Sequence, residues 1–101
     1  MINKEQIFDT ILLHQNDIEK FGVKSIGLFG SYLKNNATHN SDIDIYIDFI
    51  KEKKTFKNYT GAYFYLQNIF DKKIDFITPQ SLGKYVSSSI LKEVVYAFRN
   101  D

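Results

Sequence analysis

The chain has 101 residues, of which 44% are hydrophobic and 25% are charged, so it can bury one core, and we expect a single domain over residues 1–101. A formal net charge of +1 excludes a strong overall field for nucleic acid or membrane surfaces, and the lack of cysteine excludes disulfides and thiolate chemistry. No stretch approaches the ~18 apolar residues that span a bilayer, and the polar N-terminal segment lacks a signal-peptide core, which predicts a soluble cytoplasmic protein.

The first half of the chain predicts a helix, a buried strand and a glycine turn. Over residues 4–21 the apolar residues recur at helical spacing, and Gly22 follows as a helix stop. These apolar residues are Ile7, Ile11, Leu12, Ile18 and Phe21. The short apolar run 23–29 is bounded by glycines and reads as a strand. Gly30-Ser31 follows, with a brief helical turn from Ser31 and then a polar loop over 35–41.

The second half predicts two further strands and two helices. Residues 42–49 alternate strictly between acidic or aromatic and apolar side chains, which is the clearest strand pattern of the chain. We expect a helix over 56–70, a strand over 73–77 and a last helix over 87–99. The apolar stripe of that last helix would be Ile90, Leu91, Val94, Val95 and Phe98. The fold class that follows is α+β, a small mixed β-sheet covered by helices.

The acids of the central strand suggest metal-assisted phosphate chemistry. Asp42 and Asp44 stand two residues apart, so both carboxylates lie on one face of an extended segment, roughly 6.5–7 Å apart at Cα. Carboxylates at this spacing suit a pair of Mg²⁺ ions ~3.5–4 Å apart. Gly30 and Ser31, ten residues upstream, offer a tight turn with open N–H groups and a hydroxyl for phosphate. Two like charges on one strand face repel, so a plain wet strand edge explains the pair less well.

Asp75 is the candidate third ligand, because it is a lone acid in an apolar strand. If the strands 42–49 and 73–77 are neighbours, all three acids share one sheet face, and Asp75 could help to activate an attacking hydroxyl. Taken alone, Asp75 is as typical of a surface acid as of a ligand. Lys34 lies three residues after Ser31, within reach of a bound triphosphate.

Other polar residues favour ordinary surface or structural roles. Asp48 shares the face of the pair further along, where we interpret it as solvated, and Tyr46 is open between packing and lining the site. His14 and His39 have no partner at metal-ligand spacing. The lysines of residues 51–54 are typical of a solvated loop, with contact to an acidic partner as the alternative.

These residues carry a family resemblance. Gly30-Ser31, a gap of ten residues, Asp42-x-Asp44 and a later acid, Asp75, together resemble the DNA polymerase beta-like nucleotidyltransferase superfamily. At this size the chain is most similar to the minimal nucleotidyltransferase (MNT) domains, the antitoxins of HEPN-domain toxins. The resemblance implies the polymerase beta-like fold, ATP contacts from Gly30 and Ser31, and Mg²⁺ ligation by Asp42, Asp44 and Asp75.

The implied activity is transfer of AMP from ATP to a tyrosine of a HEPN-type partner, which would silence that toxin. Many relatives have small-Arg-Gly where this chain has Leu33-Lys34-Asn35. Lys34 keeps the positive charge without the bidentate guanidinium, and Asn35 tolerates a left-handed conformation. The alternative is an antitoxin that masks its toxin sterically and transfers nothing. A small-molecule nucleotidyltransferase is disfavoured because no length remains for an acceptor domain, and the charge disfavours nucleic-acid substrates.

Overall fold

A four-stranded mixed sheet organises the molecule, for which the computed structural model describes residues 1–81 and 87–100. The strand order is β3-β2-β1-β4. The central pair β1 (Val23–Phe29) and β2 (Ile43–Phe49) is antiparallel. Strand β3 (Ile74–Ile77) runs parallel to β2, and β4 (Val95–Arg99) runs antiparallel to β1. The expected α+β class with a small mixed sheet is therefore confirmed.

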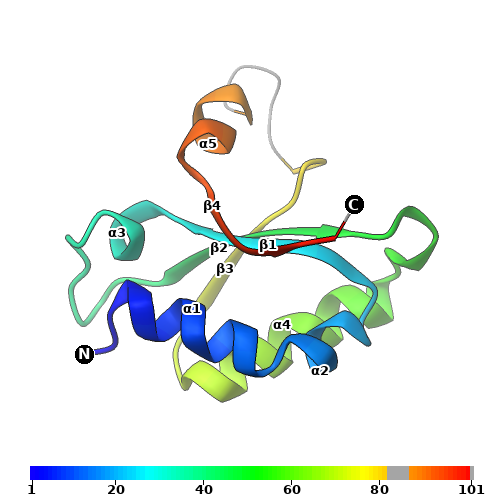
Figure 1. Cartoon of the computed structure of the whole chain (residues 1–101), viewed down its shortest axis with the longest axis horizontal. Helices are drawn as coiled ribbons and strands as arrows, with labels where there is room; N and C mark the ends of the chain where they lie inside the picture. Colours follow the sequence, from blue (N-terminus) through cyan, green and yellow to red (C-terminus); the bar gives the residue numbers. More distant parts are fainter. Residues whose placement is uncertain (82–86, 101) are drawn as a thin grey trace.

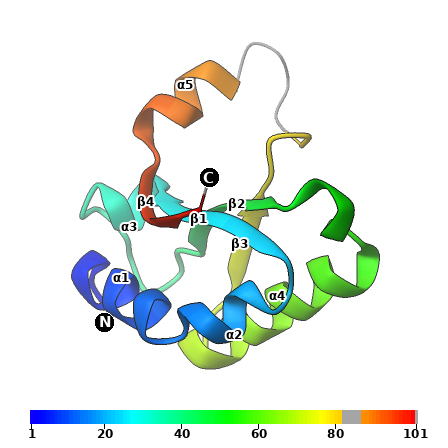
Figure 2. The same ribbon diagram turned by 45° about the vertical axis from the view of Figure 1, so that its right-hand side comes forward.

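Three helices cover one face of the sheet (Figures 1 and 2): α1 (Lys4–Leu13), α2 (Gln15–Glu19) and α4 (Phe56–Phe70). The helix α5 (Ser87–Glu93) stands on the other face, and the one-turn helix α3 (Gly30–Leu33) follows β1 directly. A 3₁₀ turn, η1 (Lys51–Lys53), follows β2. The face that carries α5 is called the open face below. In the described part of the chain no helix has the length and apolarity to cross a membrane.

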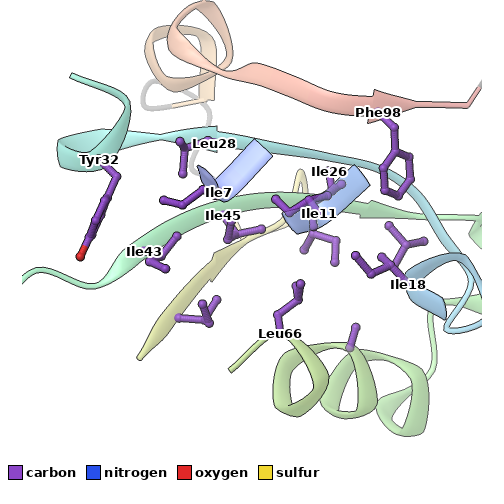
Figure 3. Packing of buried hydrophobic residues seen from close by; sticks show 14 of the residues in the cluster. Ile7, Ile11, Ile18, Ile26, Leu28, Tyr32, Ile43, Ile45, Leu66 and Phe98 are labelled. Atoms are coloured by element: carbon purple, nitrogen blue, oxygen red, sulfur yellow. The ribbon is translucent and has the colours of Figure 1, made fainter. Parts of the chain in front are cut away.

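The core lies between the sheet and the three covering helices (Figure 3). The alternation of β2 sends its isoleucines and Phe49 inward, all of them buried, as the sequence pattern predicts. Ile7 and Ile11 of α1 and Leu66 of α4 pack against this layer with no exposed surface. Burial of such side chains is worth ~1.5–3 kcal/mol each, which is the main stabilisation of the fold.

The predicted single helix over 4–21 is wrong in its extent, because the helix is interrupted at His14 and continues as a second, short helix. Helix α1 begins with a capping box, in which the Asn3 side chain accepts from the Gln6 N–H. It ends at Leu13, and His14 takes a non-helical conformation with its Nδ1 2.8 Å from the carbonyl oxygen of Thr10. Helix α2 then begins at Gln15 and ends at Glu19, and Ile11 of α1 and Ile18 of α2 are both buried.

The predicted helix over 56–70 is confirmed as α4, and the expected third strand is β3. The Thr55 hydroxyl caps α4 by accepting from the Asn58 N–H. Tyr59 and Tyr63 on this helix pack edge-on against Phe76 of β3, with ring centroids 5.5 and 5.4 Å apart. These contacts fix β3 beside β2.

The last predicted helix, 87–99, is wrong beyond Glu93. The chain forms α5 up to Glu93 and then the edge strand β4, which pairs with β1. Gly27 makes this pairing close: a Cβ at this position would lie 2.6 Å from Val94 Cγ1 and 2.9 Å from the Val95 carbonyl oxygen. The register shifts between Ile26 and Gly27, which breaks the two-residue alternation of β4. The apolar residues of β4 therefore do not alternate as in a regular strand, and in the sequence their spacing resembles that of a helix.

Candidate active site

Two of the three predicted acids stand side by side on the open face. Asp44 of β2 is the direct register partner of Asp75 in the parallel strand β3. Asp42 immediately precedes β2 and lies on the same side of the strand as Asp44. The sequence argument for a shared acidic face required these two strands to be neighbours, and the structure confirms that they are. Asp75 is exposed on the edge strand, whereas Asp42 and Asp44 are half-buried.

The crowding of these acids changes the ionisation of Asp44. Burial raises the pKa of Asp44 from its ordinary value of 3.8 to about 6, and the charges of Asp75 and Asp42 add to this rise. A hydrogen bond from the backbone N–H of Ser31 acts in the opposite direction and lowers the pKa. The site thus concentrates negative charge that a cation would relieve.

The turn after β1 is built against Asp44. Gly30 has φ +75°, and a Cβ at this position would lie 2.1 Å from Asp44 Oδ2. Only glycine accepts both this conformation and this approach. The turn closes through hydrogen bonds from the Lys34 N–H to the Gly30 carbonyl and from the Asn36 N–H to the Ser31 carbonyl. No described residue bonds the Ser31 hydroxyl, which leaves it available to a ligand.

Two residues after this turn have different roles: Asn35 adopts an unusual backbone conformation, and Lys34 forms an ion pair. Asn35 has φ +59°, the left-handed conformation that asparagine tolerates. The Nζ of Lys34 lies 3.4 Å from Glu93 Oε1 at the end of α5, and both side chains are about half exposed. Glu93 was not a candidate in the sequence because its position depends on α5. The contact of Lys34 with phosphate stays a prediction.

The donor set at this site fits Mg²⁺. Among residues 1–81 and 87–100, no group of three or more histidine, aspartate or glutamate side chains is placed so that it could hold a metal ion by itself. Mg²⁺ does not need one, because it binds through a few carboxylates together with waters and substrate phosphates. The charges of Asp42 and Asp75 both act on Asp44, and all three carboxylates are hard oxygen donors. The pairing of Asp44 with Asp75 in register, with Asp42 on the same side of the strand, is the observation that favours a cation here.

Strand β4 adds aromatic residues that the sequence analysis did not assign to the open face. Tyr46, Gly27 and Tyr96 are register neighbours across three strands. The rings of Tyr46 and Tyr96 meet edge-on, 6.1 Å apart between centroids, and the Arg99 guanidinium lies 5.0 Å from the Tyr96 ring centroid. Tyr46 is only 5% exposed, so packing is its main role. The isolated Gly27 in a strand was the available signal for this close approach.

Comparisons with known proteins agree with this geometry. A family model described as nucleotidyltransferase domain matches residues 14–97. The protein adenylyltransferase MntA of Thermococcus cleftensis is 33% identical over 97 residues, covering 95% of this chain and 97% of that protein. A Methanocaldococcus jannaschii protein, provisionally named a protein adenylyltransferase, is 40% identical over 80 residues, covering 77% of this chain and 80% of that protein.

Solved structures share the fold at low identity. A structure provisionally described as a minimal nucleotidyltransferase matches with a TM-score of 0.81 and 17% identity, covering 93% of this chain and 95% of that one. A chain of a toxin–antitoxin structure with AMP-PNP matches with a TM-score of 0.63 and 18% identity, covering 93% and 74%. A chain of the tri-AMPylated Shewanella oneidensis HEPN toxin in complex with MNT antitoxin matches with a TM-score of 0.53 and 19% identity, covering 88% and 72%.

The matched length and the sequence identity over nearly the whole chain are sufficient to assign a family. The fold agrees, since the mixed four-stranded sheet with its helices is that of a minimal nucleotidyltransferase. The chain therefore belongs to the nucleotidyltransferase family and is an enzyme of the minimal type that includes the protein adenylyltransferase MntA.

Proposed function

We propose that this enzyme transfers AMP from ATP to a tyrosine hydroxyl of a HEPN-type partner protein, and that it thereby acts as the antitoxin of that partner. The observation that carries the proposal is the packing of the Gly30 turn against Asp44, directly opposite Asp75. Support for a protein acceptor comes from the relative named protein adenylyltransferase MntA. Support for the partner comes from the shared fold with a chain of the HEPN toxin–MNT antitoxin complex.

Each residue of the site has a distinct task in this proposal. Gly30 and Ser31 place backbone N–H groups and a hydroxyl against the phosphates, and Lys34 adds positive charge. Asp42, Asp44 and Asp75 would hold divalent cations. Mg²⁺, when bound, neutralises charge on the phosphates and makes the acceptor hydroxyl more acidic. The chain itself positions the reacting groups and supplies fixed charge.

The reaction balances without any further reagent. The tyrosine oxygen forms a bond to the α-phosphorus of ATP, the bond from that phosphorus to the bridging oxygen breaks, and pyrophosphate leaves. Asp75 is the residue that we assign to accept the proton of the hydroxyl, because it is exposed on the edge strand, where a protein acceptor can approach. Asp44 is too enclosed by the Gly30 turn for that task.

Label transfer tests this function. The protein is incubated with Mg²⁺, a purified HEPN-type partner and ATP labelled at either the α- or the γ-phosphate. We expect label on the partner from the α-position alone, reduced ~100-fold or more by Asp42→Asn or Asp44→Asn. Asp9→Asn, an exposed carboxylate on α1 away from the site and the open face, is the control and should keep the activity. Equal labelling by wild type and the Asp44→Asn variant would overturn the proposal.

A further inference from the structure

A pocket of about 620 Å³ lies at the end of β2 opposite the candidate active site. Its lining combines apolar and basic side chains from the start of β1, the end of β2 and the η1 region. We call it the lysine pocket, and its defining residues are Val23, Phe49, Ile50, Lys24, Lys51 and Lys54. Neither the family comparison nor the proposed chemistry gives it a role.

The balance of charge in the lysine pocket is positive. The side-chain ammonium groups of Lys24 and Lys51 have no hydrogen-bond or ion-pair partner among residues 1–81 and 87–100, whereas the backbone carbonyl of Lys24 accepts from the Asn100 N–H. Lys54 donates to the neutral side-chain oxygen of Gln80. Two carboxylates also line the pocket, but that of Glu19 already accepts a hydrogen bond from Asn100. Three ammonium groups thus line the pocket with two carboxylates, those of Glu19 and Asp48, so the lining keeps an excess of positive charge.

The lysine pocket lies within reach of the acids along the open face. Asp48 lines the pocket and stands on the same face of β2 as Asp44, four residues further along the strand. At ~3.3 Å per residue this separation is about 13 Å, which about four residues of extended peptide would span. The lysine pocket lies at the end of the sheet, where Glu19 of α2 also lines it, and the bodies of α1, α2 and α4 pack on the face opposite the acids (Figure 2).

We propose that the lysine pocket binds an acidic segment of the acceptor protein, about four residues from the tyrosine that is modified, and so selects that tyrosine. The inference rests on the proposed function. Acidic side chains of the segment would pair with Lys24 and Lys51, and an apolar side chain would contact Ile50, which is 39% exposed. A nucleic acid fits less well, because Asp48 would repel a continuous row of phosphates and the pocket is partly apolar.

Steady-state kinetics with the partner protein as acceptor test the proposal. In the Lys24→Gln/Lys51→Gln variant we expect the KM for the acceptor protein to rise about tenfold, with kcat, the KM for ATP and transfer to a small tyrosine amide unchanged. Lys57→Gln is the matched control, because Lys57 is exposed on α4 outside the pocket. Circular dichroism melting of each variant excludes misfolding as the cause. An unchanged KM for the acceptor protein would overturn the docking role.

A binding measurement separates this inference from the proposed chemistry. The probe is a short fluorescent peptide in which a cluster of glutamates lies about four residues from a single tyrosine. Its control peptide has glutamine in place of each glutamate. The Asp44→Asn protein, which should not transfer AMP, is expected to bind the acidic probe about tenfold more tightly than its Lys24→Gln/Lys51→Gln derivative. Equal binding by both, or equal competition by a single-stranded oligonucleotide, overturns the docking role. Retained binding without label transfer by wild type overturns only the proposed function.

Discussion

In the candidate active site, the backbone of Gly30 packs directly against the side chain of Asp44. The turn that offers N–H groups to phosphate and the strand that carries the acids meet there, because position 30 has no Cβ. The backbone N–H of Ser31 hydrogen-bonds to the same carboxylate. One substitution at position 30 would thus disturb both halves of the site together.

For Gly30→Ala we expect loss of AMP transfer and a decrease of ~1–3 kcal/mol in the free energy of unfolding. The added methyl group would meet Asp44 Oδ2 at 2.1 Å, and alanine disfavours φ +75°. Urea unfolding and label transfer measure the two effects. Asn35→Gly is the informative counterpart, because it relaxes the left-handed residue of the same loop and should preserve stability. An active Gly30→Ala enzyme would contradict the described contact.

The ionisation of Asp44 predicts an unusual dependence of stability on pH. The pKa of Asp44 in the folded protein, about 6, is above its ordinary value of 3.8. The folded state therefore binds the proton more tightly than the unfolded state. The stabilisation is fully present below pH 3.8 and is lost as pH rises through about 6. At about 1.4 kcal/mol for each pKa unit the upper bound is roughly 3 kcal/mol, and solvent screening of this partly exposed carboxyl makes the loss smaller.

We expect Asp44→Asn to remove this loss of stability. Without metal, the variant should therefore exceed wild type in free energy of unfolding by more at pH 7.5 than at pH 4. Urea unfolding in the presence of a chelator measures the difference between the two proteins at each pH. Adding Mg²⁺ at pH 7.5 should stabilise wild type and leave the variant nearly unchanged. If the variant were less stable than wild type at pH 7.5 without metal, the cause assigned to the pKa shift would be wrong.

The edge strand β4 shows where sequence reasoning reached its limit. The spacing of Asp42, Asp44 and Asp75 was readable because strand alternation and the Gly-Ser turn are local features. Strand β4 depends instead on a non-local contact, in which Val94 and Val95 pack over the bare backbone of Gly27. The register shift in β4 also hides its alternation. The placement of Tyr96 on β4, next to Tyr46, could therefore not be predicted.

For Gly27→Ala we expect a decrease of ~1–3 kcal/mol in the free energy of unfolding, because the new Cβ would lie 2.6 Å from Val94 Cγ1. Amide hydrogen exchange locates the effect. Exchange should accelerate in β4, whereas the amides shared by β2 and β3 provide the internal control and should keep their relative protection. Uniform acceleration across the sheet would contradict a local role for Gly27.

The ion pair between α3 and α5 predicts competition for Lys34. If Lys34 contacts phosphate, it must leave Glu93, and a half-exposed pair of this kind is worth up to ~1 kcal/mol. We therefore expect Glu93→Gln to lower the KM for ATP by up to ~5-fold and Lys34→Gln to raise it. In the Lys34→Gln background, Glu93→Gln should have no further effect. Additive effects of the two substitutions would show that Lys34 and Glu93 act independently.

At the scale of the whole molecule, the acids of the candidate site lie on the face of the sheet opposite α1, α2 and α4. The helices α1, α2 and α4 close the other side around the core (Figure 1). A protein acceptor bound over the open face would be modified and covered at once, so an antitoxin of this architecture could act by catalysis or by steric masking. The carboxylates are needed only for catalysis.

Co-expression of the HEPN-type toxin with each form of this protein separates these two modes most directly. Cell growth reports neutralisation, and intact-mass spectrometry of the recovered toxin reports AMP on its tyrosines. We expect wild type and the control Asp9→Asn to restore growth with AMP on the toxin, and Asp44→Asn to restore neither, although it still binds the toxin. Full rescue by Asp44→Asn with an unmodified toxin would contradict the catalytic function and establish steric masking.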